Sequence, residues 1–550
     1  MSPLYFLAFW FLAMATSSAK NDLEMVQMAQ TMVLQAKNWA QSSSSDESSL
    51  LFGRGHNHNH GKGSNSQHDG LNDKNNTKYE SSLLYGRGHG HHGGTTNVFA
   101  EDNDINDNNK NYYSQSMAMV DCAKLYDQAE PRLARLLRSD EKYSHEDAVA
   151  WLSGVITSHR TCLDGLRERG VNEEVHPLSQ NLTMVLNEVL ALHAKKQKIG
   201  NKPKPKGVAQ RRPKGGSGFG GELTSWNPAI SRADVVVARD GSGNYRTINE
   251  AIRNLLGRMN GNIGKRRMIV YVKAGVYGES VEIPRNLKDV MFVGDGMGKT
   301  IVTGRGNVID GDSTLGSATF RVFGDGFWAR DMTFENTAGP QKHQAVALMV
   351  ASDHSLFYKC SFRGYQDTLY VHSLRQFYRD CHIYGTQDFI FGNAAVVLQN
   401  CDIFVRKPMR QQANVITAQG RENPNENTGI SIHGSRIRPA PEFVGINQSQ
   451  KTFLGRPWKK FSRTIVSKTD IGGLIHPSGW TKWEGSFALS TLYYAEYMNT
   501  GDGASTRARV NWPGFHVLRD PREVNPFLVR NFIQGHTWIM RTGVPVWLEM

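Results

Sequence analysis

Four polar side chains in the C-terminal half of the chain are spaced so that a repeating backbone could bring them together. Gln344 and Gln366 are 22 residues apart, and Asp367 and Asp388 are 21 residues apart. If each turn of the backbone took about that many residues, two amides and two carboxyls would lie on adjacent turns. Two carboxyls at that distance cannot both ionise cheaply, so we expect a neutral acid beside an anion, which suits nucleophilic and acid–base chemistry. Spacing by itself also fits two ordinary turn aspartates.

Three cysteines show the same period. Cys360, Cys381 and Cys401 are 21 and 20 residues apart, and each lies in a short β-prone run, at residues 357–362, 377–383 and 398–403. A repeat near 21 residues built on single strands is typical of a parallel β-helix, with one coil per repeat. Equivalent residues on successive coils lie about 4.8 Å apart, which suits a disulfide between stacked cysteines. An antiparallel sandwich needs close hairpin turns, and these are few. We therefore predict an all-β parallel β-helix for residues 233–550.

The N-terminal part carries helical patterns instead. Apolar residues recur at helical spacing in four segments, which are Asp22–Ala40, Asp121–Arg138, His145–Glu168 and Ser179–Lys196. Amphipathic helices with short connections favour an antiparallel bundle, which we place in residues 20–200. Cys122 and Cys162 fall on neighbouring helices, so an exported protein could bridge them.

A polar insert interrupts this bundle at residues 41–118. It is rich in Ser, Asn, Gly and His, and the run Glu47–His56 recurs 33 residues later as Glu80–His89, each copy leading into a histidine cluster. Two interpretations stand, a duplicated disordered insert and a loose metal-binding tract, and composition favours the first. A basic linker at residues 201–232 separates the two domains, because its Pro, Gly and Lys content prevents packing.

The chain ends and the charge indicate where the protein acts. Tyr5–Ala15 is apolar and leads to small residues ending at Ala19, which predicts a secretory signal peptide over residues 1–19. Sequons begin at Asn75, Asn181 and Asn447, as expected of an exported glycoprotein. No apolar run reaches 18 residues, so we expect no membrane-spanning helix. The 550 residues carry a net charge of +13, concentrated after residue 195, which points to an acidic partner.

Six ordered motifs identify a family. The chain from residue 233 onward resembles the plant pectin methylesterases, or pectinesterases, in the segments Val235–Asn244, Gly275–Glu279, Gln344–Leu348, Gly364–Tyr370, Asp388–Ala394 and Leu454–Trp458. The resemblance implies a right-handed parallel β-helix and a secreted, cell-wall aspartyl esterase. Such an enzyme hydrolyses methyl esters of polygalacturonate to pectate and methanol, and needs no cofactor and no metal.

The resemblance also assigns roles to the polar residues. Asp388 matches the nucleophile, Asp367 the general acid and base, and Gln344 and Gln366 the donors that stabilise the oxyanion. Arg456 matches the residue that pairs with the nucleophile and lines the substrate side.

Further assignments follow from the same resemblance. Trp458 and Thr314 match substrate-binding positions, with looser surroundings at Thr314. The family bridges the cysteines that match Cys381 and Cys401, and leaves the one that matches Cys360 free.

The chain departs from its relatives near the site and in the N-terminal region. Met349 stands where the family commonly has Arg, and Gln387 where it has Val, which could alter substrate preference but leaves the chemistry intact. The helical region resembles the inhibitor-like pro-region of these enzymes, most clearly at Asp121–Asp127. The family's first cysteine pair is absent there, however, and Arg211–Arg212 is followed by proline in place of the usual processing motif. These departures argue against inhibition by this region and against ordinary cleavage.

Other functions fit less well. A lyase or glycosidase on the same fold would leave new chain ends instead of methanol, and a decayed, wall-binding protein would have lost site residues, all of which are present. Nucleic-acid binding has the charge but no motif. We therefore expect a monomer that acts on methyl-esterified pectin, with its helical region associating with the β-helix domain of the same chain, and with neither nucleic acid nor membrane as partner.

Overall fold

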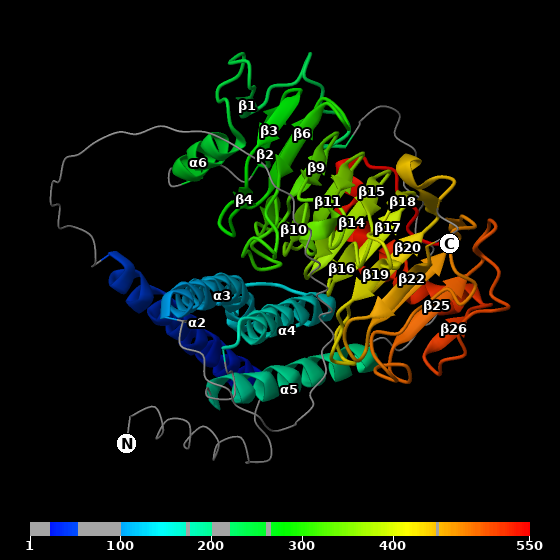
Figure 1. Ribbon diagram of the computed structural model, residues 1–550, viewed down its shortest axis with the longest axis horizontal. Coiled ribbons are helices and arrows are strands. Elements are labelled where there is room, and N and C mark those ends of the chain that lie inside the picture. Colours follow the sequence, from blue (N-terminus) through cyan, green and yellow to red (C-terminus); the bar gives the residue numbers. More distant parts are fainter. Residues whose placement is uncertain (1–21, 53–100, 172–176, 201–220, 260–265, 447–449) are drawn as a thin grey trace.

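The computed structural model describes residues 22–52, 101–171, 177–200, 221–259, 266–446 and 450–550. The expected signal peptide, most of the histidine-rich insert, the dibasic pair Arg211–Arg212 and the sequons at Asn75 and Asn447 lie outside these residues. A four-helix region stands beside a long β-structure (Figure 1). No helix in the described part of the chain combines the length and apolarity needed to span a membrane.

The four predicted helices are all present. They are α2 (Asp22–Phe52), α3 (Glu101–Leu137), α4 (His145–Glu168) and α5 (Pro177–Gly200). Two of them run further than the apolar periodicity indicated, since α2 and α3 both extend into the stretch expected to be an insert. Ser144 caps α4, where its side chain accepts a hydrogen bond from the backbone of Asp147 and that residue's carboxylate accepts one in return. A disulfide joins Cys122 of α3 to Cys162 of α4, as predicted.

The β-structure consists of three sheets in which every strand pair is parallel. The first sheet, sheet A, contains β1 (Val235–Val237), β2 (Met268–Val272), β5 (Val290–Gly294), β8 (Trp328–Arg330), β11 (Ser355–Tyr358), β14 (Arg375–Arg379), β17 (Ala395–Gln399), β20 (Gly429–His433), β23 (Arg463–Ser467), β25 (Tyr493–Tyr497) and β26 (Phe515–Val517).

The other two sheets share the remaining strands. Sheet B contains β3 (Gly275–Gly278), β6 (Thr300–Gly304), β9 (Thr333–Asn336), β12 (Ser361–Arg363), β15 (His382–Gly385), β18 (Asp402–Val405), β21 (Arg436–Pro439) and β24 (Asp470–Ile471). Sheet C contains β4 (Val281–Ile283), β7 (Phe320–Val322), β10 (Leu348–Val350), β13 (Leu369–Val371), β16 (Ile390–Gly392), β19 (Asn414–Gln419) and β22 (Thr452–Pro457). From β11 to β24 the chain visits sheets A, B and C in the same order on every coil, which confirms the predicted parallel β-helix.

A sharp turn between sheets A and B sets the repeat. Lys359, Asp380 and Asn400 have φ angles of 51°, 53° and 54°, so each coil turns there on one left-handed residue. Asp and Asn tolerate this conformation better than most residues, because their short polar side chains bond locally. The residue after each of these turns is one of the three repeat cysteines.

The cysteine ladder is present, but the bridge expected within it is not. Ser361 pairs with His382 and His382 with Asp402, so the preceding residues Cys360, Cys381 and Cys401 are stacked on successive coils. All three are buried free thiols. The expectation that Cys381 and Cys401 are bridged is therefore wrong for this structure. The reason is local, because each of these thiols donates to backbone carbonyls of the preceding strands, at 3.3 to 3.6 Å, and so has a partner of its own in the core.

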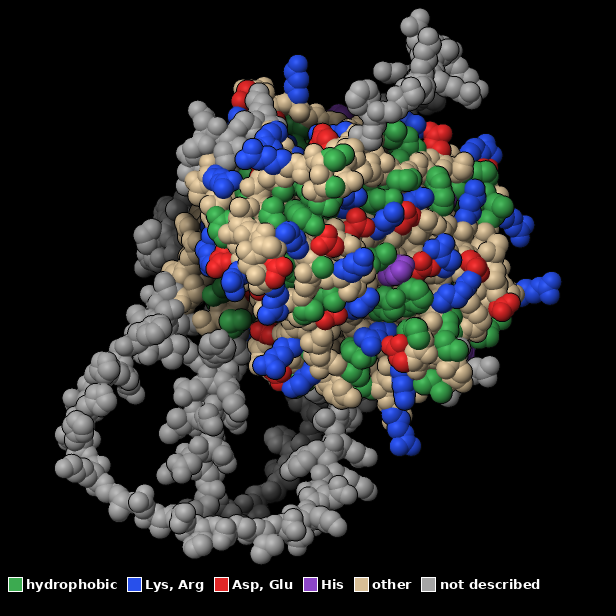
Figure 2. All heavy atoms as spheres, turned by 90° about the horizontal axis from the view of Figure 1, so that it is seen from above, with side chains coloured by type: hydrophobic (Ala, Val, Ile, Leu, Met, Phe, Trp, Pro, Cys, Tyr) green, Lys and Arg blue, Asp and Glu red, His purple; other side chains and the backbone are tan. Residues whose placement is uncertain are grey.

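Additional segments cover two outer faces of the β-helix. Helix α6 (Ile248–Met259) lies near its first coils, and the short helices α7 (Pro521–Val524), α8 (Val529–Phe532) and α9 (Gly535–Trp538) pack on sheet A. The four-helix region packs on sheet C, with α3 and α4 closest to it (Figure 1). The face seen in Figure 2 carries Lys and Arg spread among fewer Asp and Glu, without one basic patch.

Candidate active site

The two aspartates occupy equivalent places on successive coils. Leu369 of β13 pairs with Ile390 of β16, and Asp367 and Asp388 each stand two residues before these partners. Both have left-handed backbones, with φ angles of 61° and 50°, which Asp adopts more readily than most residues. The register predicted from their 21-residue spacing is therefore confirmed, and both carboxyls emerge from the turns that lead into sheet C.

Arg456 holds one of the two carboxyls. Its Nε and Nη2 donate to the two carboxylate oxygens of Asp388 at 2.8 and 2.5 Å, which is the bidentate geometry of a strong ion pair. Burial tends to lower the pKa of Arg456, but the charge of Asp388 outweighs it and raises that pKa. The arginine comes from β22, two coils away from β16 in sheet C, and keeps Asp388 an anion.

The other carboxyl is in the opposite situation. Asp367 is 7% exposed, and burial first, then the neighbouring charge of Asp388, raises its pKa well above the usual range. The pair thus consists of a neutral acid beside an anion, which is the division of roles that a nucleophile and a proton donor need.

The two predicted amide donors lie on the turns before β10 and β13. Gln366 is 8% exposed, and its Oε1 has no hydrogen-bond partner among the described residues. Gln344 is half-buried, and the residue after it, Ala345, donates its backbone N–H to the carbonyl of Gln366 at 3.3 Å. The two glutamines are therefore neighbours across adjacent coils. Gln387, one of the departures from the family, accepts a hydrogen bond from Gln412.

Apolar side chains extend from the pair along the outer face of sheet C. The strand register aligns Met349, Tyr370, Phe391 and Ala418 in one row that ends at Arg456. The rings of Tyr370 and Phe391 stack with their centroids 4.2 Å apart.

Trp458 lies beside this row. Its ring centroid is 6.0 Å from that of Phe391, and it packs on the backbone of Gly420, where an added Cβ would lie 2.8 Å from the ring. The row and Trp458 together make a flat apolar surface next to the carboxyl pair, suited to a sugar ring.

Two further residues near the site have different standings. Thr314, expected at the substrate, lies in a loop whose Ser313 donates to Asp121 of α3, and no hydrogen bond joins Thr314 to either aspartate among the described residues. Trp483 was not predicted, yet its ring lies 4.2 Å from the guanidinium carbon of Arg456. Its contact depends on the long loop after β24, which has no repeat period that could have revealed it.

The helical region covers this surface. One apolar cluster contains core residues of all four helices together with residues of sheet C and its loops, namely Leu315, Ala318, Phe323, Val346, Met349, Ala351, Tyr370, Leu374, Phe391 and Ala418.

Polar contacts follow the same interface. Trp151 of α4 donates to Asp353 at 3.1 Å, and Arg160 pairs with the buried Glu426 at 2.6 Å. The helices therefore pack directly over the row that leads to the carboxyl pair.

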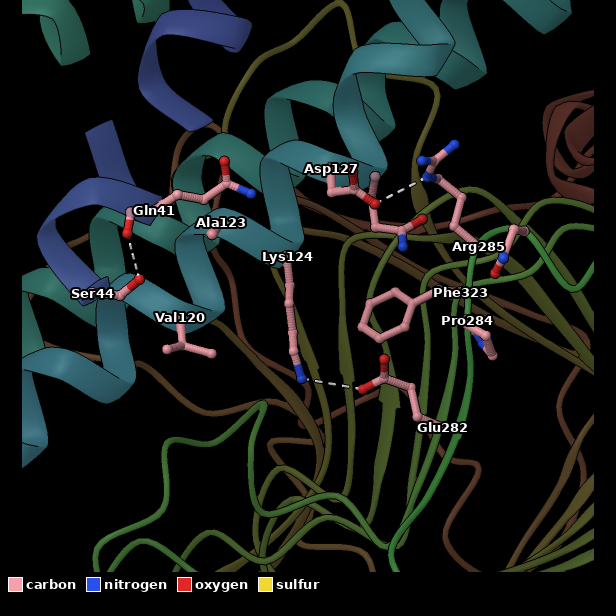
Figure 3. Close-up of a pocket in the computed structure, with 12 residues that line it drawn as sticks. Gln41, Ser44, Val120, Ala123, Lys124, Asp127, Glu282, Pro284, Arg285 and Phe323 are labelled. Carbon is pink, nitrogen blue, oxygen red and sulfur yellow. Dashed lines mark hydrogen bonds and ion pairs between the residues drawn. The ribbon is translucent and has the colours of Figure 1, made fainter. Parts of the chain in front are cut away.

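A cavity of about 460 Å³ lies between α2, α3 and the start of sheet C, away from the carboxyl pair. In it Lys124 pairs with Glu282 at 3.3 Å and Arg285 with Asp127 at 3.1 Å (Figure 3). None of the predicted site residues lines it. Among the described residues, no group of three or more His, Cys, Asp or Glu is arranged to hold a metal ion.

Comparison with known proteins gives the same answer as the geometry. The pectinesterase family model matches residues 234–536, and the plant invertase/pectin methylesterase inhibitor model matches residues 94–192. The chain is 57% identical over 459 residues to probable pectinesterase/pectinesterase inhibitor 36 of Arabidopsis thaliana, covering 79% of this chain and 87% of that protein. It is 50% identical over 432 residues to pectinesterase 2 of Citrus sinensis, covering 78% and 81%.

A solved structure agrees with these relatives. The pectin methylesterase from carrot superposes with a TM-score of 0.56 and 51% identity, covering 58% of this chain and 98% of that one. The chain therefore belongs to the pectinesterase family of enzymes, with a region ahead of its catalytic domain that matches the plant pectin methylesterase inhibitors.

Proposed function

We propose that this pectinesterase removes methyl groups from polygalacturonate through a covalent intermediate on Asp388. The observation that carries the proposal is the ion pair of Asp388 with Arg456 beside the buried acid Asp367. An ionised carboxylate is needed to attack the ester carbonyl carbon, and a bidentate arginine keeps it ionised and fixed in orientation.

The reaction then needs an oxyanion site and a proton donor. The carbonyl oxygen of the ester becomes negatively charged in the tetrahedral intermediate, and the amide N–H groups of Gln344 and Gln366 donate to it. Asp367 gives its proton to the departing methoxide, which leaves as methanol, and an acyl–carboxylate anhydride on Asp388 remains. Asp367, now an anion, takes a proton from water as the water attacks the acyl carbon, and this step releases the galacturonate carboxylate and restores both aspartates.

The apolar surface next to the pair supports the choice of substrate. Trp458 offers a ring face to a sugar or methyl group, and Thr314 is placed as a further contact on the loop opposite α3. The predicted signal peptide over residues 1–19 supports an exported enzyme that acts on pectin in the cell wall, as a monomer.

The covering helices add a condition. Because α3 and α4 pack on the face along which the polymer would lie, we propose that substrate reaches the pair only when they move aside. The missing cysteine pair and the insert argued against inhibition, but neither prevents this packing in the described helices.

Measurement of methanol tests the function directly. The secreted chain should release methanol from methyl-esterified pectin, and Asp388→Asn should abolish the release while circular dichroism and melting temperature stay close to wild type. New reducing or unsaturated ends without methanol would indicate a glycosidase or lyase instead. Retention of a tenth or more of the activity by Asp388→Asn would overturn the nucleophile assignment.

A further inference from the structure

Lys459 directly follows Trp458 and faces the helical region rather than the β-helix. Its Nζ lies 2.8 Å from Oδ2 of Asp164 in the last turns of α4, and the two side chains are 20% and 21% exposed. Among the described residues, Asp164 is the one acidic side chain that forms an ion pair with Lys459. The ammonium group also lies 5.6 Å from the centroid of the Trp458 ring.

This ion pair belongs to the catalytic face. Asp164 and Lys459 line one small cavity together with Trp458 and Tyr370, between α4 and sheet C. Arg456, three residues before Lys459, is already engaged by Asp388 and is not available to a second carboxylate. Lys459 is therefore the cation of this cavity that loses its partner when α4 moves away.

Helix α4 directs a second carboxyl toward the same place. Glu168 follows Asp164 by one helical turn, and its carboxyl lies near enough to Lys459 and to Asp367 for their charges to interact. Burial first, and then Asp164, raises the pKa of Glu168. The end of α4 thus presents carboxyls one turn apart to the cleft, much as a polyuronide presents carboxyls along its length.

We propose that Lys459 binds the carboxylate of an unesterified galacturonate unit next to the reacting ester, and that Asp164 holds this position while the helices are docked. The proposal rests on the proposed function, whose substrate carries such carboxylates wherever methyl groups have been removed. A half-buried ammonium without a partner is costly, so a substrate carboxylate would replace the one that Asp164 withdraws.

The test compares two substrates in the full-length chain. Methanol release is measured on fully methyl-esterified pectin and on partly de-esterified pectin, and the ratio of the two kcat/KM values is taken. This ratio does not depend on the fraction of molecules whose cleft is open. Lys459→Gln should lower the ratio by about tenfold, because a charge-assisted hydrogen bond to the free carboxylate is lost. Lys459→Arg should keep most of it, and this guards against a folding effect.

Asp164→Asn tests the second half of the proposal. It should raise methanol release from both substrates and leave their ratio unchanged, because it frees Lys459 without altering it. Lys124→Ala is the matched control, since it breaks an ion pair to Glu282 at the same interface but away from the cleft (Figure 3). Any loosening of the helices by Lys124→Ala should also leave the ratio unchanged.

The outcomes separate the two proposals. If methanol is released but the ratio is the same in wild type and Lys459→Gln, the carboxylate site is wrong and the esterase function stands. If Asp164→Asn releases no more methanol than Lys124→Ala does, Asp164 does not hold the site. If no variant and no wild-type sample releases methanol, the proposed function itself fails, and this inference fails with it.

Discussion

Asp367 and Asp388 are repeat-equivalent residues with opposite surroundings. Each precedes a strand of sheet C by the same two residues, yet Arg456 bonds to Asp388, whereas Asp367 is buried beside that charge. A repeating backbone thus supplies two identical positions, and one arginine from a later coil makes them chemically different.

Removing that arginine should therefore remove the distinction. We expect Arg456→Ala to lower kcat by at least roughly 10² and to destabilise the fold by about 3–5 kcal/mol, because a buried carboxylate loses its partner. Methanol assays and urea unfolding measure the two effects. Arg438→Ala, which breaks a more exposed pair with Asp470, is the control and should change stability by less than about 1 kcal/mol. Equal losses in both variants would contradict the special place of Arg456.

Stability should depend on pH through Asp367. Its folded pKa lies well above the value of about 3.9 expected for the unfolded chain, so its contribution is fully present below pH 4 and is lost as pH rises through the folded pKa. We expect Asp367→Asn to melt higher than wild type by a margin that grows with pH above about 4. Melting curves from pH 4 to 8 measure this. The exposed Asp240→Asn should show no such growing margin, and a constant difference for Asp367→Asn would mean that the acid is not held protonated.

Catalysis should show a matching trend. Because Asp367 must carry a proton to release methanol, the rate should fall as pH rises through its raised pKa. A pH profile of kcat on methyl-esterified pectin checks the descending limb, which should be absent from the residual activity of Asp367→Asn. A wild-type rate that is flat across the same range would remove Asp367 from the proton-donor role.

Gln366 offers a test of the oxyanion site. Gln366→Ala should lower kcat by roughly 10²–10³ with little change in KM, as loss of one oxyanion donor commonly does. Gln341→Ala changes an exposed glutamine three residues before Gln344 and should be neutral. A rise in KM with an unchanged kcat would assign Gln366 to ground-state binding instead.

The cysteines give a prediction by simple counting. Alkylation of the unfolded, unreduced chain should modify three thiols, those of Cys360, Cys381 and Cys401, and leave Cys122 and Cys162 bridged. In the native protein none should react at neutral pH, because burial raises the pKa of Cys360 and of Cys381. A single reactive thiol in the unfolded chain would restore a bridge between Cys381 and Cys401.

The sequence predicted the β-helix and the register of the site because spacing translates directly into position there. One coil takes about 21 residues, so residues that far apart must lie on neighbouring coils, and Asp367 and Asp388 do. The same logic placed the cysteines correctly but not their chemistry, since a thiol close to another can bond to a carbonyl instead. The helix pattern likewise identified four helices but not the ends of α2 and α3, which lie in polar sequence.

Contacts between distant segments could not be read in this way. The pairing of Lys459 with Asp164 and the position of Trp483 over Arg456 arise where a helix or a long loop meets the coils. No period relates those segments, and their docking depends on the shapes of many apolar side chains at once. The family resemblance gave Arg456 its partner, but the residues that cover the cleft appear only in the folded chain.

The left-handed backbone at both catalytic aspartates also constrains how this gene can drift. Asn fits such a backbone as readily as Asp, whereas most other residues strain it. A single-base change from an Asp to an Asn codon at position 388 would therefore leave a protein that folds, is exported and holds pectin, but cleaves nothing. Inactive copies of this kind should be the easiest descendants for a duplicated gene to reach, and a reversion at the same base would restore the enzyme.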